Sequence, residues 1–402
     1  MRTYFGRIVR LYLWVTAVLG GTAVLLFHFI PFAVQKLLNR VVNPPAGPKP
    51  VLRQPIPVVD LHADPPLWRR DWLKHNQHGH IDLPRLIEGN VVVQVFAAAT
   101  KIPLGINFEQ NSTNQPDLLT LLAFGQGWPR RTWGSLLQRA LFMAERVKEL
   151  EGMSNGRFRL IQSTADLQQL LNDRQNQPDM VGGLLALEGI HALEGKLTNL
   201  DMLYDAGFRI IGLTHFFDND AGGSAHGLEQ GGLTPFGREL IRRIQEGGMI
   251  LDLAHAAPRL IDDVLAISQK PLIVSHTGFQ GVHDSPRNLS DDHARAIAAT
   301  GGLMGMAFFP ETTGGDTLVS IVKAIRYGVD LVGIEHIAIG TDFDGAITAP
   351  IDASGMPYLV EALSQSGFSD AEIRMVMGGN ALALLKRLLP DKRRIMNDGE
   401  VV

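Results

Sequence analysis

Short apolar runs alternate with amphipathic stretches along most of the chain, from about residue 58 onward. The amphipathic stretches 236–248 and 290–302 have helical spacing, and Ser290 suits the N-cap of the second. The apolar runs have the length of strands: 57–62, 90–98, 182–189, 209–215, 249–255, 271–276, 301–309 and 336–345. Eight strand–helix alternations predict a parallel (β/α)8, TIM-like barrel. An open Rossmann-type sheet is the alternative, but no GxGxxG follows the first run.

Residues 100 to 180 fit this alternation least well. The stretch 100–135 reads as a long loop with a partial helix, and a clearer helix follows over 136–152. A long loop above the carboxyl ends of barrel strands often serves as a lid or a specificity element. An ordinary surface excursion is an equally good interpretation.

The N-terminal part of the chain has a different pattern. No charged side chain occurs from Leu11 to Gln35, and this mostly apolar stretch is long enough to cross a hydrocarbon core of about 30 Å. No Ala-x-Ala site follows it, which disfavours a cleaved signal peptide. A buried core helix is also disfavoured, because a linker with six prolines follows at 43–57.

These patterns divide the chain into five parts. We expect a basic flank over 1–10, a transmembrane signal anchor over 11–34, a Pro-rich linker over 35–57, the barrel over 58–390 and a flexible tail over 391–402. The anchor predicts a single-pass membrane protein in contact with the lipid bilayer. Its barrel is expected outside the cytoplasm, which is the periplasmic side in a bacterium.

Composition removes several classes of function. The 37 Lys+Arg and 41 Asp+Glu give a formal net charge of −4, so no basic surplus supports nucleic-acid binding. The chain has no cysteine, which excludes disulfides, Cys-liganded zinc, iron–sulfur clusters and a Cys nucleophile. Any metal ion must therefore be bound by His, Asp and Glu side chains.

Chemically active side chains follow nearly every predicted strand. They are His62 and Asp64, Glu188, His215, His255, His276 and Asp342. The carboxyl ends of parallel barrel strands converge on one face, so these side chains are expected to meet there. A single His after a strand is usually structural, but six strand ends with the same property predict a polynuclear metal site.

Residue types divide these side chains into metal ligands and others. His62 and Asp64 are two apart on a strand, so both can address one ion, while His255 and His276 end consecutive strands and suit a second. Glu188 has two carboxylate oxygens and can bridge both ions. Two such ions can hold a bridging hydroxide and stabilise a tetrahedral oxyanion. HExxH, GxSxG and GxxxxGK[ST] motifs are absent.

The sequence resembles the membrane dipeptidase (renal dipeptidase) family of binuclear zinc peptidases, which have amidohydrolase-like barrels. The resemblance runs along most of residues 58 to 390. It rests on nine motifs: DLHADPP (60–66), LEGIHALEG (187–195), LTH (213–215), LTPFGRELI (233–241), LDLAH (251–255), SHTG (275–278), SPRNLSD (285–291), GTDFDG (340–345) and GGN (378–380). The last motif is expected to be a tight turn and a helix cap.

This resemblance implies a zinc dipeptidase and a role for each site residue. His62 and Asp64 would hold one Zn²⁺, His255 and His276 a second, and Glu188 would bridge them. His215 would contact the substrate or the developing oxyanion, and Arg287 would bind the free α-carboxylate of a dipeptide. Asp342 would bind its amino group or carry the proton of the attacking water to the leaving amine. Asp344 is expected to support Asp342.

Other features leave the substrate open. The segments 100–135 and 216–227 match the family poorly, and both are expected where side-chain preference is set. A homodimer would have to form without a disulfide, because there is no cysteine. One alternative function is a related amidohydrolase acting on a lactam, a cyclic amide or an N-acyl amino acid. Another is a non-catalytic, membrane-tethered binding protein.

Overall fold

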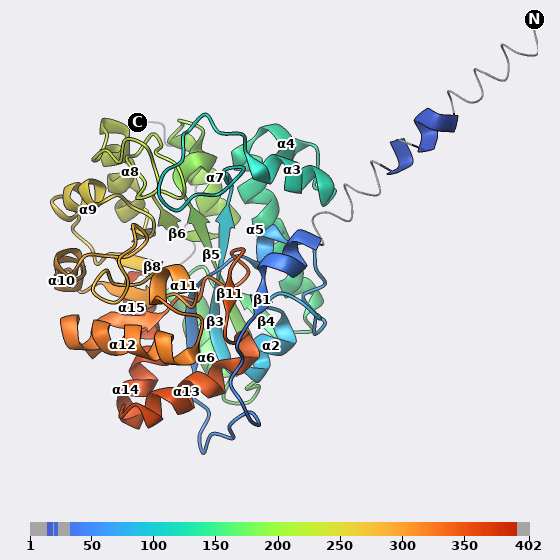
Figure 1. The fold of residues 1–402 in the computed structure, drawn as a ribbon. Coiled ribbons are helices and arrows are strands. Elements are labelled where there is room, and N and C mark those ends of the chain that lie inside the picture. Colours follow the sequence, from blue (N-terminus) through green and yellow to red (C-terminus); the bar gives the residue numbers. More distant parts are fainter. Residues whose placement is uncertain (1–13, 19, 23–32, 392–402) are drawn as a thin grey trace, which may run out of the picture.

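Eight parallel strands form a closed barrel at the centre of the protein (Figure 1). The computed structural model describes residues 14–18, 20–22 and 33–391. The barrel strands are β2 (Val58–Ala63), β3 (Val91–Ala99), β5 (Val181–Glu188), β6 (Phe208–Gly212), β7 (Ile250–Asp252), β8 (Ile273–Thr277), β9 (Leu303–Met306) and β10 (Ile337–Ile339). Each lies within one of the eight predicted apolar runs or overlaps it, and the predicted (β/α)8 barrel is confirmed.

Helices surround the barrel on the outside, and most follow a strand. They are α2 (Leu83–Glu88), α3 (Leu118–Gly125), α4 (Arg131–Gly134), α5 (Leu136–Met153), α6 (Thr164–Asp173), α7 (Thr198–Ala206), α8 (Pro235–Glu246), α9 (Pro258–Leu265), α10 (Asp291–Ala299), α11 (Pro310–Thr313), α12 (Leu318–Val332), α13 (Met356–Gln365), α14 (Asp370–Arg374) and α15 (Asn380–Leu388). The predicted N-cap Ser290 accepts a hydrogen bond from the backbone of His293.

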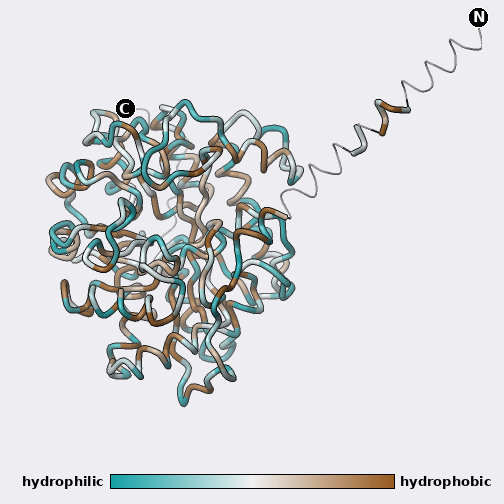
Figure 2. The backbone as a smooth tube through the Cα atoms, in the orientation of Figure 1, coloured by the Kyte–Doolittle hydropathy of each residue, from teal (hydrophilic) through white to brown (hydrophobic). Residues whose placement is uncertain are grey.

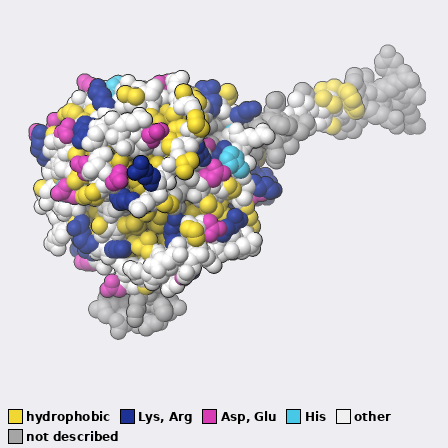
Figure 3. Space-filling view, turned by 90° about the horizontal axis from the view of Figure 1, so that it is seen from below, with side chains coloured by type: hydrophobic (Ala, Val, Ile, Leu, Met, Phe, Trp, Pro, Cys, Tyr) yellow, Lys and Arg dark blue, Asp and Glu magenta, His cyan; other side chains and the backbone are white. Residues whose placement is uncertain are grey.

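The barrel strands are buried on both faces, which explains their continuous apolar sequence. Figure 2 shows the hydrophobic residues concentrated along the strands and on the helices against them. Inside the barrel, Val59, Ile210 and Ile250 belong to the same apolar cluster as Leu384 of α15 and Leu170 of α6. Charged side chains of both signs are interspersed on the face seen in Figure 3.

The barrel closes where β3 pairs directly with β5. Seven residue pairs join these strands, from Val93 with Gly182 to Ala99 with Glu188. A further strand, β4 (Phe158–Leu160), pairs with the start of β5 from outside the ring. Gly183 makes this possible, since a Cβ atom there would lie 2.2 Å from the ring of Phe158.

The structure corrects the prediction of a membrane anchor. No helix among the described residues is long and apolar enough to cross a bilayer. This finding overturns the single-pass anchor over 11–34, its contact with lipid and the extracytoplasmic location derived from it. Of that segment, residues 11–13, 19 and 23–32 lie outside the described part, as do 1–10 and 392–402.

Part of the predicted linker lies against the barrel. Gln35 and Asn39 are buried, and β1 (Arg40–Val41) pairs in parallel with β11 (Thr348–Ala349). The strand β11 follows the loop after β10. The segment before the barrel is therefore attached beside a loop at the carboxyl end of the strands.

Candidate metal centre

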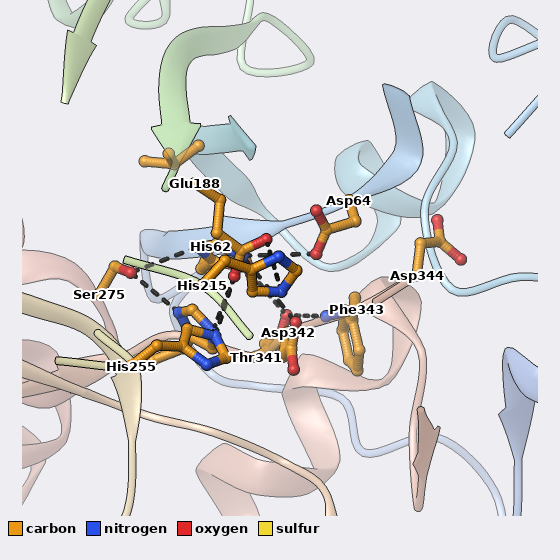
Figure 4. A network of polar contacts seen from close by, with 12 residues as sticks. His62, Asp64, Glu188, His215, His255, Ser275, Thr341, Asp342, Phe343 and Asp344 are labelled. Carbon is orange, nitrogen blue, oxygen red and sulfur yellow. Dashed lines mark hydrogen bonds and ion pairs between the residues drawn. The ribbon is translucent and has the colours of Figure 1, made fainter. Parts of the chain in front are cut away.

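Seven of the predicted site residues lie together at the carboxyl ends of the barrel strands (Figure 4). His62, Glu188 and His276 are in strands β2, β5 and β8, and the other four follow their strands within three residues: Asp64, His215, His255 and Asp342. All seven are at least 92% buried. The barrel topology thus brings residues from six strand ends into one cluster.

Glu188 is at the centre of this cluster. Its Oε1 atom lies 3.0 Å from Nε2 of His255, 3.4 Å from Nε2 of His276 and 3.5 Å from Nε2 of His62. Its Oε2 atom lies 3.5 Å from Nε2 of His215. The carboxylate of Glu188 therefore lies among four imidazoles, three beside Oε1 and one beside Oε2.

His62 also faces two further carboxylates. Its Nε2 atom lies 3.4 Å from Oδ2 of Asp64 and 3.9 Å from Oδ1 of Asp342. Its ring stacks on that of His276 with centroids 3.6 Å apart. This arrangement places three buried carboxylates beside one another, those of Asp64, Glu188 and Asp342.

Burial dominates the electrostatics of the cluster. Burial raises the pKa of Asp64 to about 8, and it raises the pKa values of Glu188 and Asp342 well above their usual range. Neighbouring carboxylates raise these pKa values further. Burial also lowers the pKa values of His215, His255 and His276 far below the usual one. These three imidazoles are therefore neutral. The guanidinium of Arg287 offsets only part of the effect of burial on the pKa values of Glu188 and Asp342, so positive charge is missing from the cluster.

Divalent cations would supply that missing charge. Three groups have ligand atoms within 4.8 Å of one another: His62 with Asp64 and Glu188, His62 with His276 and Asp342, and Glu188 with His215 and His255. The Nε2 atom of His62 and the Oδ1 atom of Asp64 are buried without a hydrogen-bond partner. Neutral imidazole and carboxylate donors suit zinc and other borderline divalent ions, so the residues fit the expected metals.

Buried polar side chains that the sequence analysis missed hold the ligands in place. The hydroxyl of Ser275 lies 2.9 Å from Nδ1 of His276 and 3.3 Å from Nδ1 of His62, so it orients both rings from behind. Asp60 accepts hydrogen bonds from the backbone and hydroxyl of Thr341 and from the side chain of Gln94. Ser275 directly precedes His276 in SHTG, and Asp60 lies two residues before His62 in DLHAD. This closeness to predicted ligands was the signal in the sequence that could have identified both residues.

Left-handed backbone conformations determine the direction in which several of these side chains point. His255 has φ 62°, Asp342 φ 62° and Asp344 φ 65°. This region costs a non-glycine residue about 1–2 kcal/mol, so tertiary contacts must stabilise it. Around Asp342 they include hydrogen bonds from its N–H to the carbonyl of His62 and from the N–H of Asp64 to the carbonyl of Phe343.

Arg287 lies beside the cluster, between the ligands and a pocket. Its Nη2 atom donates to the carbonyl of His276 at 2.6 Å, while its Nε atom is buried without a partner. A pocket of about 530 Å³ is lined by Arg287, His255, Gln110, Gln230 and others. This volume suits a small ligand, and the guanidinium suits a carboxylate on it.

The two segments that were hard to interpret from the sequence meet over this pocket. In the 100–135 segment, Asn111 donates from its backbone to the carbonyl of His226 at 2.7 Å. Nδ1 of His226 lies 2.6 Å from the carbonyl of Phe108, and the rings of Phe108 and Phe216 are 5.6 Å apart. The segments 100–135 and 216–227 thus form one wall beside His255.

Comparisons with known proteins found a matching family model and several relatives. A model of the membrane dipeptidase family, peptidase family M19, matches residues 49–395. Dipeptidase verJ of Clonostachys rogersoniana is 26% identical over 361 residues, which cover 86% of this chain and 87% of that protein. An uncharacterised protein encoded in the pqqA 5′ region of Klebsiella pneumoniae is 31% identical over 258 residues, covering 60% of this chain and 93% of that one.

Solved structures give the same result. The crystal structure of dipeptidase AC, a metallopeptidase of family M19, has a TM-score of 0.68 at 25% identity and covers 84% of this chain and 99% of its own. A metallopeptidase from Rhodobacter sphaeroides, bound to a phosphinate mimic of the dipeptide L-Ala-D-Ala, has a TM-score of 0.67 at 24% identity. That match covers 83% of this chain and 100% of the other.

Proposed function

We propose, from the premise that this chain belongs to the membrane dipeptidase family and is a metallopeptidase, that it hydrolyses dipeptides with two zinc ions. The observation that carries the proposal is the buried cluster around Glu188. Burial keeps His215, His255 and His276 neutral, and the nearby Arg287 offsets only part of the effect of burial on the pKa values of Glu188 and Asp342. A cluster of this composition is stabilised by divalent cations, and family membership supplies the reaction class.

The proposed ligand set follows the family resemblance, and the histidines of both sets have their Nε2 atoms within 3.5 Å of Glu188. His62 and Asp64 would hold one ion, His255 and His276 the other, and Glu188 would contribute to both. His215 is also close to Glu188, at 3.5 Å. We assign it to the substrate because the family resemblance implies that role, although its ligand atom also lies within 4.8 Å of those of Glu188 and His255. When bound, the two ions would polarise the scissile carbonyl and lower the pKa of the attacking water.

The other site residues would bind and orient the dipeptide. Arg287 would hold its α-carboxylate through the Nε atom that has no partner in the protein. His215 would hydrogen-bond the carbonyl oxygen as negative charge develops on it. Asp342 would hold the free amino group, or accept the water proton at its carboxylate and pass it to the leaving amine.

This arrangement favours dipeptides over the alternative amide substrates. A lactam, a cyclic amide or an N-acyl amino acid lacks at least one free terminus. Such a substrate would leave the charge of Arg287 or Asp342 buried without a partner, which is costly. The homodimer without a disulfide stays a prediction.

A hydrolysis assay with the purified full chain tests the proposal. We expect cleavage of unblocked L-L or L-D dipeptides, its loss on chelation, and recovery with two equivalents of Zn²⁺. N-acetylated and C-amidated analogues should be cleaved poorly. A protein that binds two metal ions but cleaves only blocked amides would instead favour the amidohydrolase alternative.

A further inference from the structure

The loop that presents Asp342 has an unusual backbone. Asp342, Asp344 and Ala346 all have φ between 62° and 65°, the left-handed region that side chains disfavour. Local preference therefore does not determine where the Asp342 carboxylate points. Contacts made by the rest of the loop must do so.

Asp344 supplies most of these contacts, and it points away from the metal centre (Figure 4). Its side chain has no exposed surface. Its Oδ1 atom accepts from the backbone N–H of His80 at 2.8 Å and from Nη1 of Arg70 at 3.1 Å. Its Oδ2 atom accepts from Nη2 of Arg70 and from the backbone N–H of Ile81.

The backbone of Asp344 is held as firmly as its side chain. Its carbonyl accepts from the indole of Trp68 at 2.6 Å, and its N–H donates to Nδ1 of His80 at 3.2 Å. The ring of His80 stacks on that of Phe343, with centroids 4.9 Å apart. The connection between β2 and α2 thus contacts both the ring of Phe343 and the backbone and side chain of Asp344.

Arg70 pairs with Asp344 at closer range than His80, whose Nδ1 atom lies 3.6 Å from Oδ1 of Asp344, and Arg70 is enclosed. Its side chain is 1% exposed. Gly79 leaves space for it, because a Cβ atom there would lie 1.4 Å from Nη1 of Arg70. With the amide oxygen of Gln35 turned toward the guanidinium, Gln35 accepts from Nη1 at 2.9 Å and from Nε at 3.2 Å.

The segment that carries Gln35 is attached to the same loop a second time. The pairing of β1 with β11 joins Arg40 to Thr348, and the N–H of Val42 donates to the carbonyl of Ala349 at 2.9 Å. The loop is therefore held by the β2–α2 connection on one side and by residues 35–42 on the other.

We propose that Arg70 and Asp344 are positioning residues that set the orientation of Asp342, and that Gln35 holds Arg70 in place. This inference rests on the proposed function, in which Asp342 contacts the dipeptide or its protons. Arg70 links Gln35 of the N-terminal segment to Asp344 of the loop. This link stabilises the left-handed backbone conformation, which the loop would not adopt alone. Neither residue contacts the metal cluster.

Dipeptide kinetics of the full-length Asp344→Asn and Arg70→Met proteins test the inference. We expect kcat to fall about 10- to 100-fold, as is usual for residues that support an active group, with KM within about threefold of wild type. Metal content should stay at the wild-type value, because no proposed ligand is touched. Arg70→Lys restores one charged donor and should recover part of the lost kcat.

Arg209→Met is the matched control. Arg209 is 2% exposed, and its guanidinium donates to three carbonyls at the opposite, amino end of the barrel. Its loss should lower the melting temperature and leave kcat unchanged. An equal kcat loss in Arg209→Met, or no loss in Asp344→Asn, would overturn the inference while wild-type activity keeps the proposed function intact.

Two further outcomes are decisive. If wild type cleaves no dipeptide, the proposed function fails and takes this inference with it. If Arg70→Met and Asp344→Asn do not fold, Gln35→Ala decides, since it removes only the two hydrogen bonds to Arg70. A kcat about two- to fivefold below wild type supports the inference, and an unchanged kcat overturns it.

Discussion

Asp342 and Asp344 are two residues apart and both buried, but their pKa values are shifted in opposite directions. Burial and the neighbouring Asp64 raise the pKa of Asp342 well above the usual value. Burial acts on Asp344 in the same way, but the charge of Arg70 and hydrogen bonds outweigh it and hold the pKa of Asp344 well below its usual range. The difference lies in the partners that each carboxylate has.

This comparison distinguishes two kinds of buried charge cluster. The cluster of Arg70, His80 and Asp344 is balanced within the protein and stabilises a loop. The cluster around Glu188 has an excess of carboxylates and needs cations from outside. A buried carboxylate without a partner marks a site for a ligand, whereas a paired one marks a structural support.

The largest effect is expected from removing the central carboxylate of the unbalanced cluster. Glu188→Ala should abolish binding of both metals together and lower kcat/KM at least about 10³-fold, since a bridging ligand serves both ions. Metal analysis and dipeptide assays on the same preparation measure this. An active Glu188→Ala protein would contradict the binuclear assignment.

The pH dependence of stability should differ between the metal-free and the metal-loaded protein. The folded-state pKa of Asp64 is raised to about 8, so the folded protein binds more protons than the unfolded one. The lowered pKa values of His215, His255 and His276 act in the opposite direction below their unfolded value of 6.5. Stability of the metal-free protein should therefore fall mainly as pH rises from about 6.5 to 8, by at most about 1.4 kcal/mol per pH unit and group. Thermal unfolding at pH 5, 6, 7 and 8 measures the slope.

The balanced cluster provides the control for this slope. The pKa of Asp344 is lowered, so its contribution is present above the unfolded value of 3.8 and is lost only at lower pH. Metal-free Asp344→Asn should keep most of the wild-type slope between pH 5 and 8, losing only the part by which the charge of Asp344 raises the pKa of Asp64. Zinc should abolish the slope in both proteins. Identical slopes with and without zinc would show that the unbalanced carboxylates do not bind the metals.

A smaller effect is expected from removing the guanidinium of Arg287, which lies beside the cluster. Arg287→Met should lower kcat/KM for unblocked dipeptides about 10²-fold, or about 2.7 kcal/mol, because a charge-assisted bidentate contact is lost. The residual rate on C-amidated dipeptides should stay the same in both proteins. If both substrates lose activity equally, Arg287 supports the loop and does not bind the carboxylate.

The smallest effect is expected from removing the hydroxyl of Ser275, which lies behind the two histidine ligands. Ser275→Ala removes the hydroxyl that orients His62 and His276, so metal affinity should fall about tenfold. Competition with a chelator of known affinity measures the change. Ser163→Ala, at the buried start of α6, should lower stability and leave metal affinity unchanged.

The sequence predicted the barrel and the members of the cluster for a physical reason. Parallel strands buried on both faces are continuous apolar runs, and six of the eight runs here end at or near a residue with a chemical function. Knowing that such ends converge was sufficient to gather His62, Glu188 and His276 on one face. The roles of the individual residues came from the family resemblance.

Other features depend on contacts that no local pattern shows. Arg70 pairs with Asp344 across 274 residues of chain, and Gln35 lies in a stretch that looked like a spacer. The tight turn expected at 378–380 is a π-helical turn over Met375–Gly379 that leads into α15. A Cβ atom at Gly378 would lie 2.6 Å from the carbonyl of Pro57, so packing against the barrel determines that turn.

The direct pairing of β3 with β5 has a consequence for how this protein can change over evolution. The seam ends at the pair of Ala99 with Glu188, so the 100–135 segment is inserted where the ring is already closed, and it contributes no strand to the ring. The length and composition of that segment can vary without shifting the register of any ligand-bearing strand. The wall of the pocket can therefore diversify toward new substrates while the reaction chemistry is inherited unchanged.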